Sequence, residues 1–139
     1  MSTAFVDTDV IIRFLTGDDP VKQTAARRLF GRAVNEDLLL TVPHTVIADA
    51  TYVLRSRNLY HLPKPVIAEM LSDLLSQKGF NIEDRESVLD ALDLYGEYSK
   101  LDFTDALIIA MMWRNNDSLL YSYDSDYDTF PGISRREPD

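Results

Sequence analysis

The sequence predicts an α/β protein with a mainly parallel central sheet and helices on both faces, in three α/β/α layers. Three observations support this. Short β-rich runs alternate with segments whose apolar residues recur at helical spacing. A length of 139 residues with 45% hydrophobic residues suits one domain, 1–139. The first apolar run stops at Asp7 and Asp9, at the carboxyl end of a strand, where open α/β sheets bind ligands.

The residue pattern in the first half of the chain predicts two strands and three helices. Residues 3–6 are small, aromatic or β-branched and suit a buried strand, and 10–15 suit a helix. Pro20 follows Asp18-Asp19 and opens a helix that extends to 34. The apolar run 38–42 predicts a second strand, and Pro43 begins a helix that extends to about 55.

The second half continues the alternation. Helical spacing predicts a helix over 65–76, ended by Gly79, and a short strand over 80–82. Residues 86–98 form an amphipathic surface pattern, whereas 103–113 are apolar nearly all round and predict a buried helix. The run 118–123 is the last clear strand, and Pro131-Gly132 turns the chain into a final segment expected at the sheet edge. Parallel strands share one carboxyl edge, so Asp7 and Asp124 are expected to converge.

Composition excludes several classes of site. The absence of cysteine excludes disulfides, thiolate catalysis and Cys-ligated zinc, and His44 and His61 leave little for a histidine site. No apolar run approaches the roughly 20 residues of a membrane span, and the start of the chain does not resemble a signal peptide, so we expect a cytoplasmic protein. Cations that prefer oxygen ligands remain.

The net charge of −9 is unevenly distributed. Residues 1–64 carry eight Lys/Arg against seven Asp/Glu, whereas 65–139 carry six against sixteen. A basic strip is therefore feasible on an acidic protein, and its candidate members for contact with a phosphate backbone are Arg13, Arg27, Arg28 and Arg32. The alternative is an ordinary solvated helix face.

Each candidate carboxylate also has a purely structural explanation. Asp7 or Asp9 would serve as an N-cap for the helix that follows. Asp49 lies on or beside the apolar stripe of its helix, where a buried ion pair with Arg13 or Arg55 would account for it. Asp102 and Asp105 resemble a capping box, and Asp124 and Asp126 suit a polar loop.

Taken together, the acids predict a cation site. Four carboxylates gathered at one sheet edge would repel, at about 3 kcal/mol for each pair ~5 Å apart at an effective dielectric of ~20. A divalent cation reverses this sign, and ligands restricted to oxygen favour Mg²⁺ or Mn²⁺. Such a site suits metal-dependent phosphoryl transfer.

Four segments resemble the PIN-domain ribonucleases, most closely the VapC-type toxins of toxin–antitoxin pairs. Phe-Val-Asp-Thr-Asp-Val resembles the opening motif, where Asp-Thr-Asn is more usual, and Val-Ile-Ala-Asp-Ala-Thr resembles the helix of the second acid, usually Glu. Leu-Asp-Phe-Thr-Asp-Ala-Leu-Ile-Ile-Ala is the most specific match, and Leu-Tyr-Ser-Tyr-Asp-Ser-Asp-Tyr is similar to the closing motif.

The resemblance implies roles for named residues. The metal-binding and catalytic acids would be Asp7, Asp49, Asp105 and Asp124, and the auxiliary residues Thr8, Asp9, Asp102, Ser122 and Asp126. It further implies Mg²⁺- or Mn²⁺-dependent cleavage of RNA by a homodimer that a cognate antitoxin inhibits. The shorter side chain of Asp49 puts full activity in question, because catalytic geometry is sensitive to displacements of ~1 Å.

Two other readings stay open. The segment Phe-Val-Asp-Thr-Asp-Val also resembles the nucleophile motif of haloacid dehalogenase-like phosphatases, with Asp7 attacking phosphorus and Asp9 as general acid. The chain would alternatively be a catalytically weakened PIN-fold module that binds RNA or an antitoxin, with Asp49 as a sign of decay.

Overall fold

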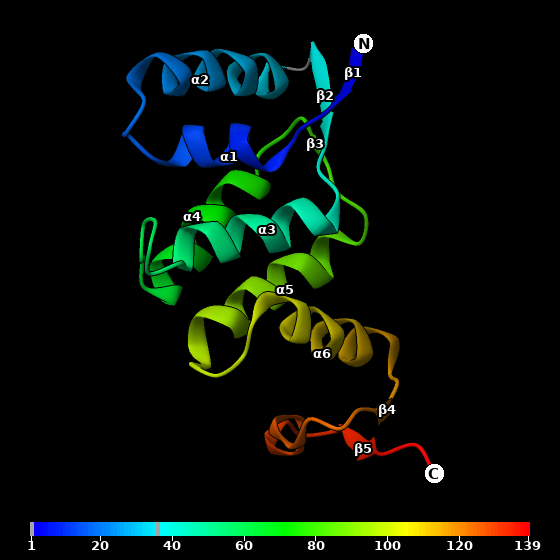
Figure 1. Cartoon of the computed structure of the whole chain (residues 1–139). Coiled ribbons are helices and arrows are strands. Elements are labelled where there is room, and N and C mark those ends of the chain that lie inside the picture. Colours follow the sequence, from blue (N-terminus) through cyan, green and yellow to red (C-terminus); the bar gives the residue numbers. More distant parts are fainter. Residues whose placement is uncertain (1, 36) are drawn as a thin grey trace.

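The computed structural model describes residues 2–35 and 37–139 and has the predicted α/β composition (Figure 1). The first half comprises β1 (Ser2–Phe5), α1 (Thr8–Leu15), α2 (Pro20–Val34), β2 (Leu38–Thr41) and α3 (His44–Arg55). The second half comprises α4 (Lys64–Leu75), β3 (Phe80–Asn81), α5 (Arg85–Glu97), α6 (Phe103–Asn115), β4 (Leu119–Tyr121), the 3-10 helix η1 (Ser125–Thr129) and β5 (Ser134–Arg136). The predicted α/β class is confirmed.

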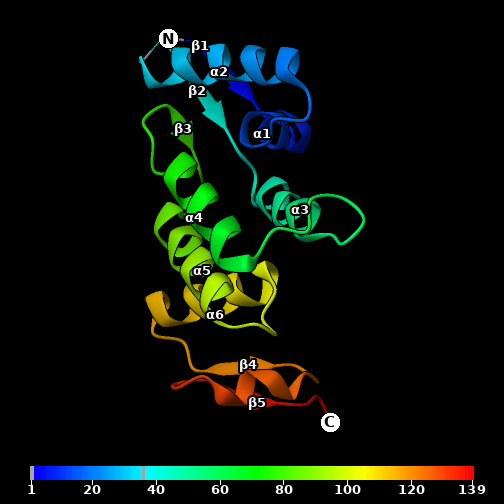
Figure 2. The ribbon, with the colours of Figure 1, turned by 90° about the vertical axis from the view of Figure 1, so that its left-hand side faces the viewer.

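The strands pair in parallel, as predicted, but they form two sheets. One sheet has the order β1-β2-β3, with Ser2 opposite Leu38 and Leu40 opposite Phe80. The other contains β4 and β5, with Leu119 opposite Ser134, so the final segment does pair as a strand. The two sheets lie at opposite ends of the molecule, with helices between them (Figures 1 and 2). The expectation of one central sheet is therefore not met within this chain.

Packing around α6 explains the position of the second sheet. This helix is apolar on several sides and needs cover beyond α5, against which it packs. Phe130 supplies that cover, because its ring lies 4.9 Å from that of Tyr98 and 6.5 Å from that of Trp113, between centroids. Burial of Tyr127 and Phe130 anchors the segment between β4 and β5, so both strands follow α6.

The core continues from the first sheet through the helices. Its fully buried side chains include Ile11, Leu40, Ile47, Leu54, Leu71, Leu92 and Ile109. Gly79 permits close approach at the start of β3: its φ is +88°, and an added Cβ would lie 2.2 Å from the carbonyl oxygen of Ala33. Within the described ranges, no helix is long and apolar enough to cross a bilayer.

Candidate functional site

Asp105 is the best-defined acid of the candidate site. Asp102 caps α6 by accepting a hydrogen bond from the Asp105 amide at 2.9 Å, which fixes the first turn. The Tyr127 hydroxyl donates to Asp105 Oδ1, also at 2.9 Å. Burial raises the pKa of Asp105, the Tyr127 hydrogen bond opposes this, and the negative charges of Asp102 and Asp124 add to it. Asp105 therefore lies half-buried among like charges.

Tyr127 is the last residue of the segment that resembles the closing motif, and no role was predicted for it. It is buried, and burial together with its hydrogen bond to Asp105 raises its pKa, so the hydroxyl stays a donor at neutral pH. The available signal was its position as the aromatic residue within the acidic run 124–128. An aromatic side chain in such a loop needs a buried contact, and here that contact is the predicted third acid.

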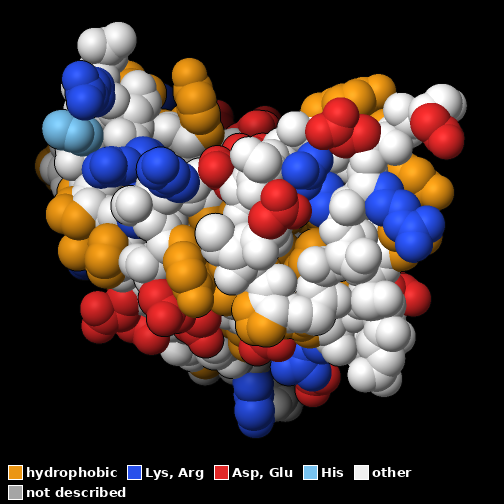
Figure 3. All heavy atoms as spheres, turned by 90° about the horizontal axis from the view of Figure 1, so that it is seen from below, with side chains coloured by type: hydrophobic (Ala, Val, Ile, Leu, Met, Phe, Trp, Pro, Cys, Tyr) orange, Lys and Arg blue, Asp and Glu red, His pale blue; other side chains and the backbone are white. Residues whose placement is uncertain are grey.

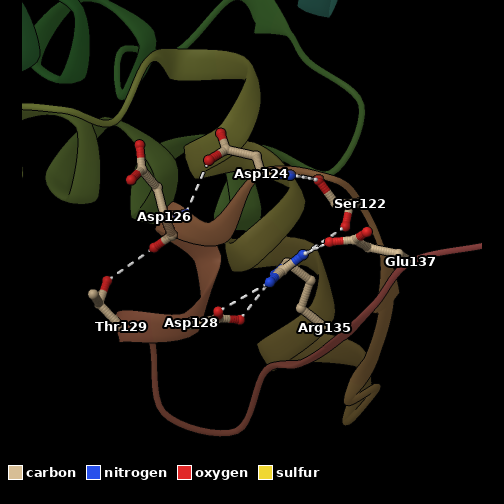
Figure 4. A network of polar contacts seen from close by, with 7 residues as sticks. All are labelled: Ser122, Asp124, Asp126, Asp128, Thr129, Arg135 and Glu137. Carbon is tan, nitrogen blue, oxygen red and sulfur yellow. Dashed lines mark hydrogen bonds and ion pairs between the residues drawn. The ribbon is translucent and has the colours of Figure 1, made fainter.

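Asp124 is held by its own loop. Its amide donates to Ser122 Oγ at 3.0 Å, and its Oδ1 accepts from the Asp126 amide at 2.9 Å. Figure 4 shows the carboxylates of Asp124 and Asp126 projecting to the same side, away from Arg135. Arg135 instead pairs with Asp128 at 2.9 Å and with Glu137 at 3.2 Å. Arg135 therefore does not neutralise the negative charges of Asp124 and Asp126.

Asp7 immediately precedes α1, and Asp49 lies on α3, which packs against α1 and also contacts α6. Asp7 is exposed and accepts from the Thr8 amide at 2.7 Å, the helix cap that its position allowed. Asp49 is exposed on α3, and within residues 2–35 and 37–139 its carboxylate has no hydrogen bond or ion pair. The proposed ion pairs for Asp49 are not formed, because Arg13 binds Asp18 at 3.2 Å and Arg55 donates to the Leu62 carbonyl.

Asp9 lines a groove between α1 and α2 instead of joining either group of acids. Arg13 and Lys22 lie in the same groove, with Val10, Ala25 and Leu29 as its apolar floor. Asp9 and Arg13 are one helical turn apart and share a face of α1. Asp9 thus faces cationic side chains here.

The expected convergence of Asp7 with Asp124 does not occur within one chain, because β1 and β4 belong to different sheets. Among the residues that the structure describes, no three His, Asp or Glu side chains lie close enough to hold a metal ion. The oxygen donors suit Mg²⁺ or Mn²⁺ chemically. Their arrangement in a single copy does not fit such an ion, so the metal-ligand roles of Asp7, Asp49, Asp105 and Asp124 stay a prediction.

A cleft beside Asp102 gathers basic and aromatic side chains. It lies where α3, α4 and the end of α5 meet, and it is lined by Tyr52, Arg55, Arg57, Lys64, Lys100 and Asp102, among others. Tyr52 is 76% exposed there, which leaves its ring free for stacking. Positive charge therefore borders the acidic first turn of α6.

The predicted basic strip is a different surface. Arg27 and Arg28 are exposed on α2, Arg32 pairs with Asp37 at 3.6 Å, and Arg13 is bound to Asp18. None of these four arginines lines the cleft beside Asp102. Their assignment to RNA binding stays a prediction, whereas Arg57 and Lys100 line the cleft that contains Asp102.

Lys64, in the first turn of α4, binds the segment that connects α5 to α6. Its ammonium donates to the backbone carbonyls of Tyr98 and Leu101 and lies 4.5 Å from the centroid of the Tyr95 ring. Burial lowers the pKa of Lys64. Leu101 immediately precedes Asp102, so this lysine helps to place the first turn that carries Asp102 and Asp105.

Parallel strands, intervening helices and acids at strand and helix ends define a small α/β protein whose candidate site is built from carboxylates. The chain belongs to the PIN domain family, a family of nucleases, whose pattern matches residues 4–133. This confirms the resemblance to PIN domains and favours it over the phosphatase reading. A solved structure that the chain resembles is VapC20 of Mycobacterium tuberculosis, described as a sarcin-ricin loop cleaving toxin. The two share 18% identity over 90% of this chain and 92% of that one, with a TM-score of 0.41. No curated protein matches the chain.

Proposed function

We propose that this protein is a divalent-metal-dependent endoribonuclease and the toxin of a toxin–antitoxin pair. The observation that carries the proposal is the Asp105 site of a PIN-family chain: a half-buried carboxylate, oriented by Tyr127 and surrounded by Asp102 and Asp124. Such a group of acids is unfavourable unless a cation neutralises it. A bound Mg²⁺ or Mn²⁺ would stabilise developing charge on a phosphodiester and lower the pKa of water.

The chain's own residues would orient the substrate. Arg57 and Lys100 in the cleft would bind backbone phosphates, and the exposed ring of Tyr52 would stack on an unpaired base. Because the net charge of −9 repels phosphates elsewhere on the surface, RNA would bind only at this local basic surface. Tyr127 and the Asp102 cap would hold Asp105 in one orientation.

Cleavage of defined RNAs with Mn²⁺, and with a chelator in its place, tests the proposal. We expect Asp105→Asn to reduce the rate at least about 100-fold, since weaker perturbations of metal sites already cost 10–100-fold. Asp117→Asn is the matched control, because Asp117 is an exposed acid just beyond the end of α6. Cleavage without metal, or a fully active Asp105→Asn, would contradict the proposal.

A catalytically weakened binding module is distinguished by metal titration. The proposed enzyme binds Mn²⁺ with an affinity that depends on Asp105, whereas a module without catalysis shows no such dependence.

We also infer a cytoplasmic homodimer that a cognate antitoxin inhibits. Expression should arrest growth with the wild type but not with Asp105→Asn, and coexpression of the antitoxin should relieve the arrest. Continued growth with the active wild-type enzyme would contradict the toxin role.

A further inference from the structure

The outer edges of β1 and β4 have no pairing strand among the described residues, as is also true of the outer edges of β3 and β5. Every residue of β1 is exposed, and the Phe5 side chain is 76% exposed. At the other end of the molecule, Leu119 and Tyr121 of β4 are 46% and 61% exposed. Parallel sheets are normally buried on both faces, and an open edge is a template for another strand. Figure 3, seen from the end that carries β4 and β5, shows apolar side chains among the charged ones.

The exposed area of the chain matches that of one half of a dimer. Its accessible surface is 8271 Å² for a mass of 15.9 kDa. A folded monomer of this mass exposes about 7,400 Å², so the chain exposes roughly 900 Å² more than expected. A standard interface covers about 800 Å² on each partner. The excess is therefore of the size that one partner surface would cover.

Strand alternation fixes which amides of β1 and β4 point to their outer edges. Val6 donates to the Thr41 carbonyl in β2, so strand alternation turns the amides of Thr3 and Phe5 to the open edge of β1. Ser122 donates to the Arg136 carbonyl in β5, so the amides of Leu119 and Tyr121 face the open edge of β4.

This alternation permits a parallel register with Thr3 opposite Leu120. Counting along both strands from that pair then places Asp7 opposite Asp124. The register that joins the two open edges is thus one that brings the predicted first and fourth acids together.

We propose that two copies of the chain exchange these edges, with β4 of each copy adding to β1 of its partner. The product is a closed, symmetric dimer with two five-stranded parallel sheets of order β3-β2-β1-β4-β5. Pairing within one copy is not available in this conformation, since the two edges lie at opposite ends (Figures 1 and 2).

Each site of the dimer is composite. Asp7 comes from one copy, and Asp102, Asp105 and Asp124 come from the other. This part of the inference rests on the proposed function. It explains why the donor chemistry suits a cation while the donors of a single copy lie apart. Because gathered carboxylates repel, Mn²⁺ should tighten the dimer.

Mixing two inactive variants tests the composite site. Asp7→Asn and Asp105→Asn alter residues that different copies contribute to each composite site. A mixed dimer therefore has one intact site and one site that carries both substitutions. After subunit exchange at equal concentrations, about a quarter of wild-type activity should return, because half of the dimers are mixed and each has one of its two sites intact. Asp105→Asn mixed with Asp124→Asn is the control, because Asp124 belongs to the loop whose Tyr127 binds Asp105, so both residues lie on the same side and no intact site forms. An active wild type with an inactive first mixture would overturn the inference.

Cross-linking tests the exchange without relying on activity. The natural chain has no cysteine, so Ala4→Cys/Tyr121→Cys carries a single pair of thiols in the proposed register. Oxidation should link two chains covalently. A control pair, Val21→Cys/Tyr121→Cys, should not cross-link, because Val21 lies on α2. A bridge within one chain, or no greater cross-linking than in the control, would overturn the exchange.

A proline tests the edge itself. Thr3→Pro removes an amide at the open edge of β1 and leaves the β1–β2 ladder intact. In light scattering with Mn²⁺, the wild type should have twice the chain mass of 15.9 kDa, Thr3→Pro the single mass, and the control Thr3→Val the doubled mass. A monomeric wild type, or a dimeric Thr3→Pro, would refute the exchange. Dimerisation and cross-linking without any RNase activity would instead refute the proposed function alone.

Discussion

Tyr127→Phe removes one hydroxyl from the candidate site and leaves the ring that fills the core. The lost bond, 2.9 Å to Asp105 Oδ1, involves a charged acceptor. Hydrogen bonds to charged groups contribute about 1.5–3 kcal/mol, and the partial exposure of Asp105 reduces this to about 1 kcal/mol of unfolding free energy at pH 7. For a chain of this length, that loss lowers the Tm by about 3 °C.

The loss should depend on pH with a definite sign. Burial raises the pKa of Asp105 above its unfolded value, so ionisation destabilises the folded state, and stability is lost as pH rises through the folded pKa. The Tyr127 hydroxyl limits that loss by stabilising the carboxylate. The difference between wild type and Tyr127→Phe should therefore be full at pH 7 and shrink at pH 4, where Asp105 takes up its proton.

Urea unfolding followed by Trp113 fluorescence measures this difference, because Trp113 is the sole tryptophan and contacts Phe130 in the C-terminal segment. Tyr123→Phe is the matched control. Tyr123 is 72% exposed and, within the described part of the chain, its hydroxyl has no hydrogen bond, so its loss should cost less than about 0.5 kcal/mol. A loss in Tyr127→Phe that is equal at pH 7 and pH 4, or that matches the control, would refute the reasoning.

Three further predictions concern other parts of the molecule. Asp49→Glu should preserve or raise Mn²⁺-dependent RNase activity, because it restores the longer side chain usual at this position; a clear loss would count against the alignment of Asp49 with the second acid. Gly79→Ala should cost at least about 2 kcal/mol in urea unfolding, because a Cβ would meet the Ala33 carbonyl at 2.2 Å and φ is positive; near-wild-type stability would show that β3 shifts freely. Arg57→Ala should weaken RNA binding and reduce the salt slope by about 1, whereas Arg28→Ala should change neither; the reverse result would return the RNA to the α2 surface.

Local features of the fold were predictable from the sequence. Asp19 before Pro20, Asp102 before Phe103 and the two asparagines at the end of α6 mark helix ends. The structure has caps at each: Asp19 accepts from the Lys22 amide, Asp102 accepts from the Asp105 amide, and Asn116 adopts a φ of 58°. These signals operate within a few residues.

Features that depend on distant packing were not predictable. Strand 118–123 was expected in one sheet with 3–6, but β4 follows α6, whose Trp113 contacts Phe130. The role of Tyr127 was missed for the same reason, because only the folded chain brings the loop 124–128 to Asp105. Conversely, the arginines grouped in the sequence are separated by their pairing with Asp18 and Asp37.

The Lys64 ammonium has a consequence for the order in which the helices form. α5 has no basic residue in its last turn, and the carbonyl of its C-cap residue Tyr98 receives a proton donor from α4 instead. A cation at that end stabilises a helix through its dipole, so α5 depends on another helix for a contribution that is usually local. As an isolated peptide, α5 should fray at its carboxyl end. During folding, its last turn and the chain leading to Asp102 should become ordered only after α4 has docked.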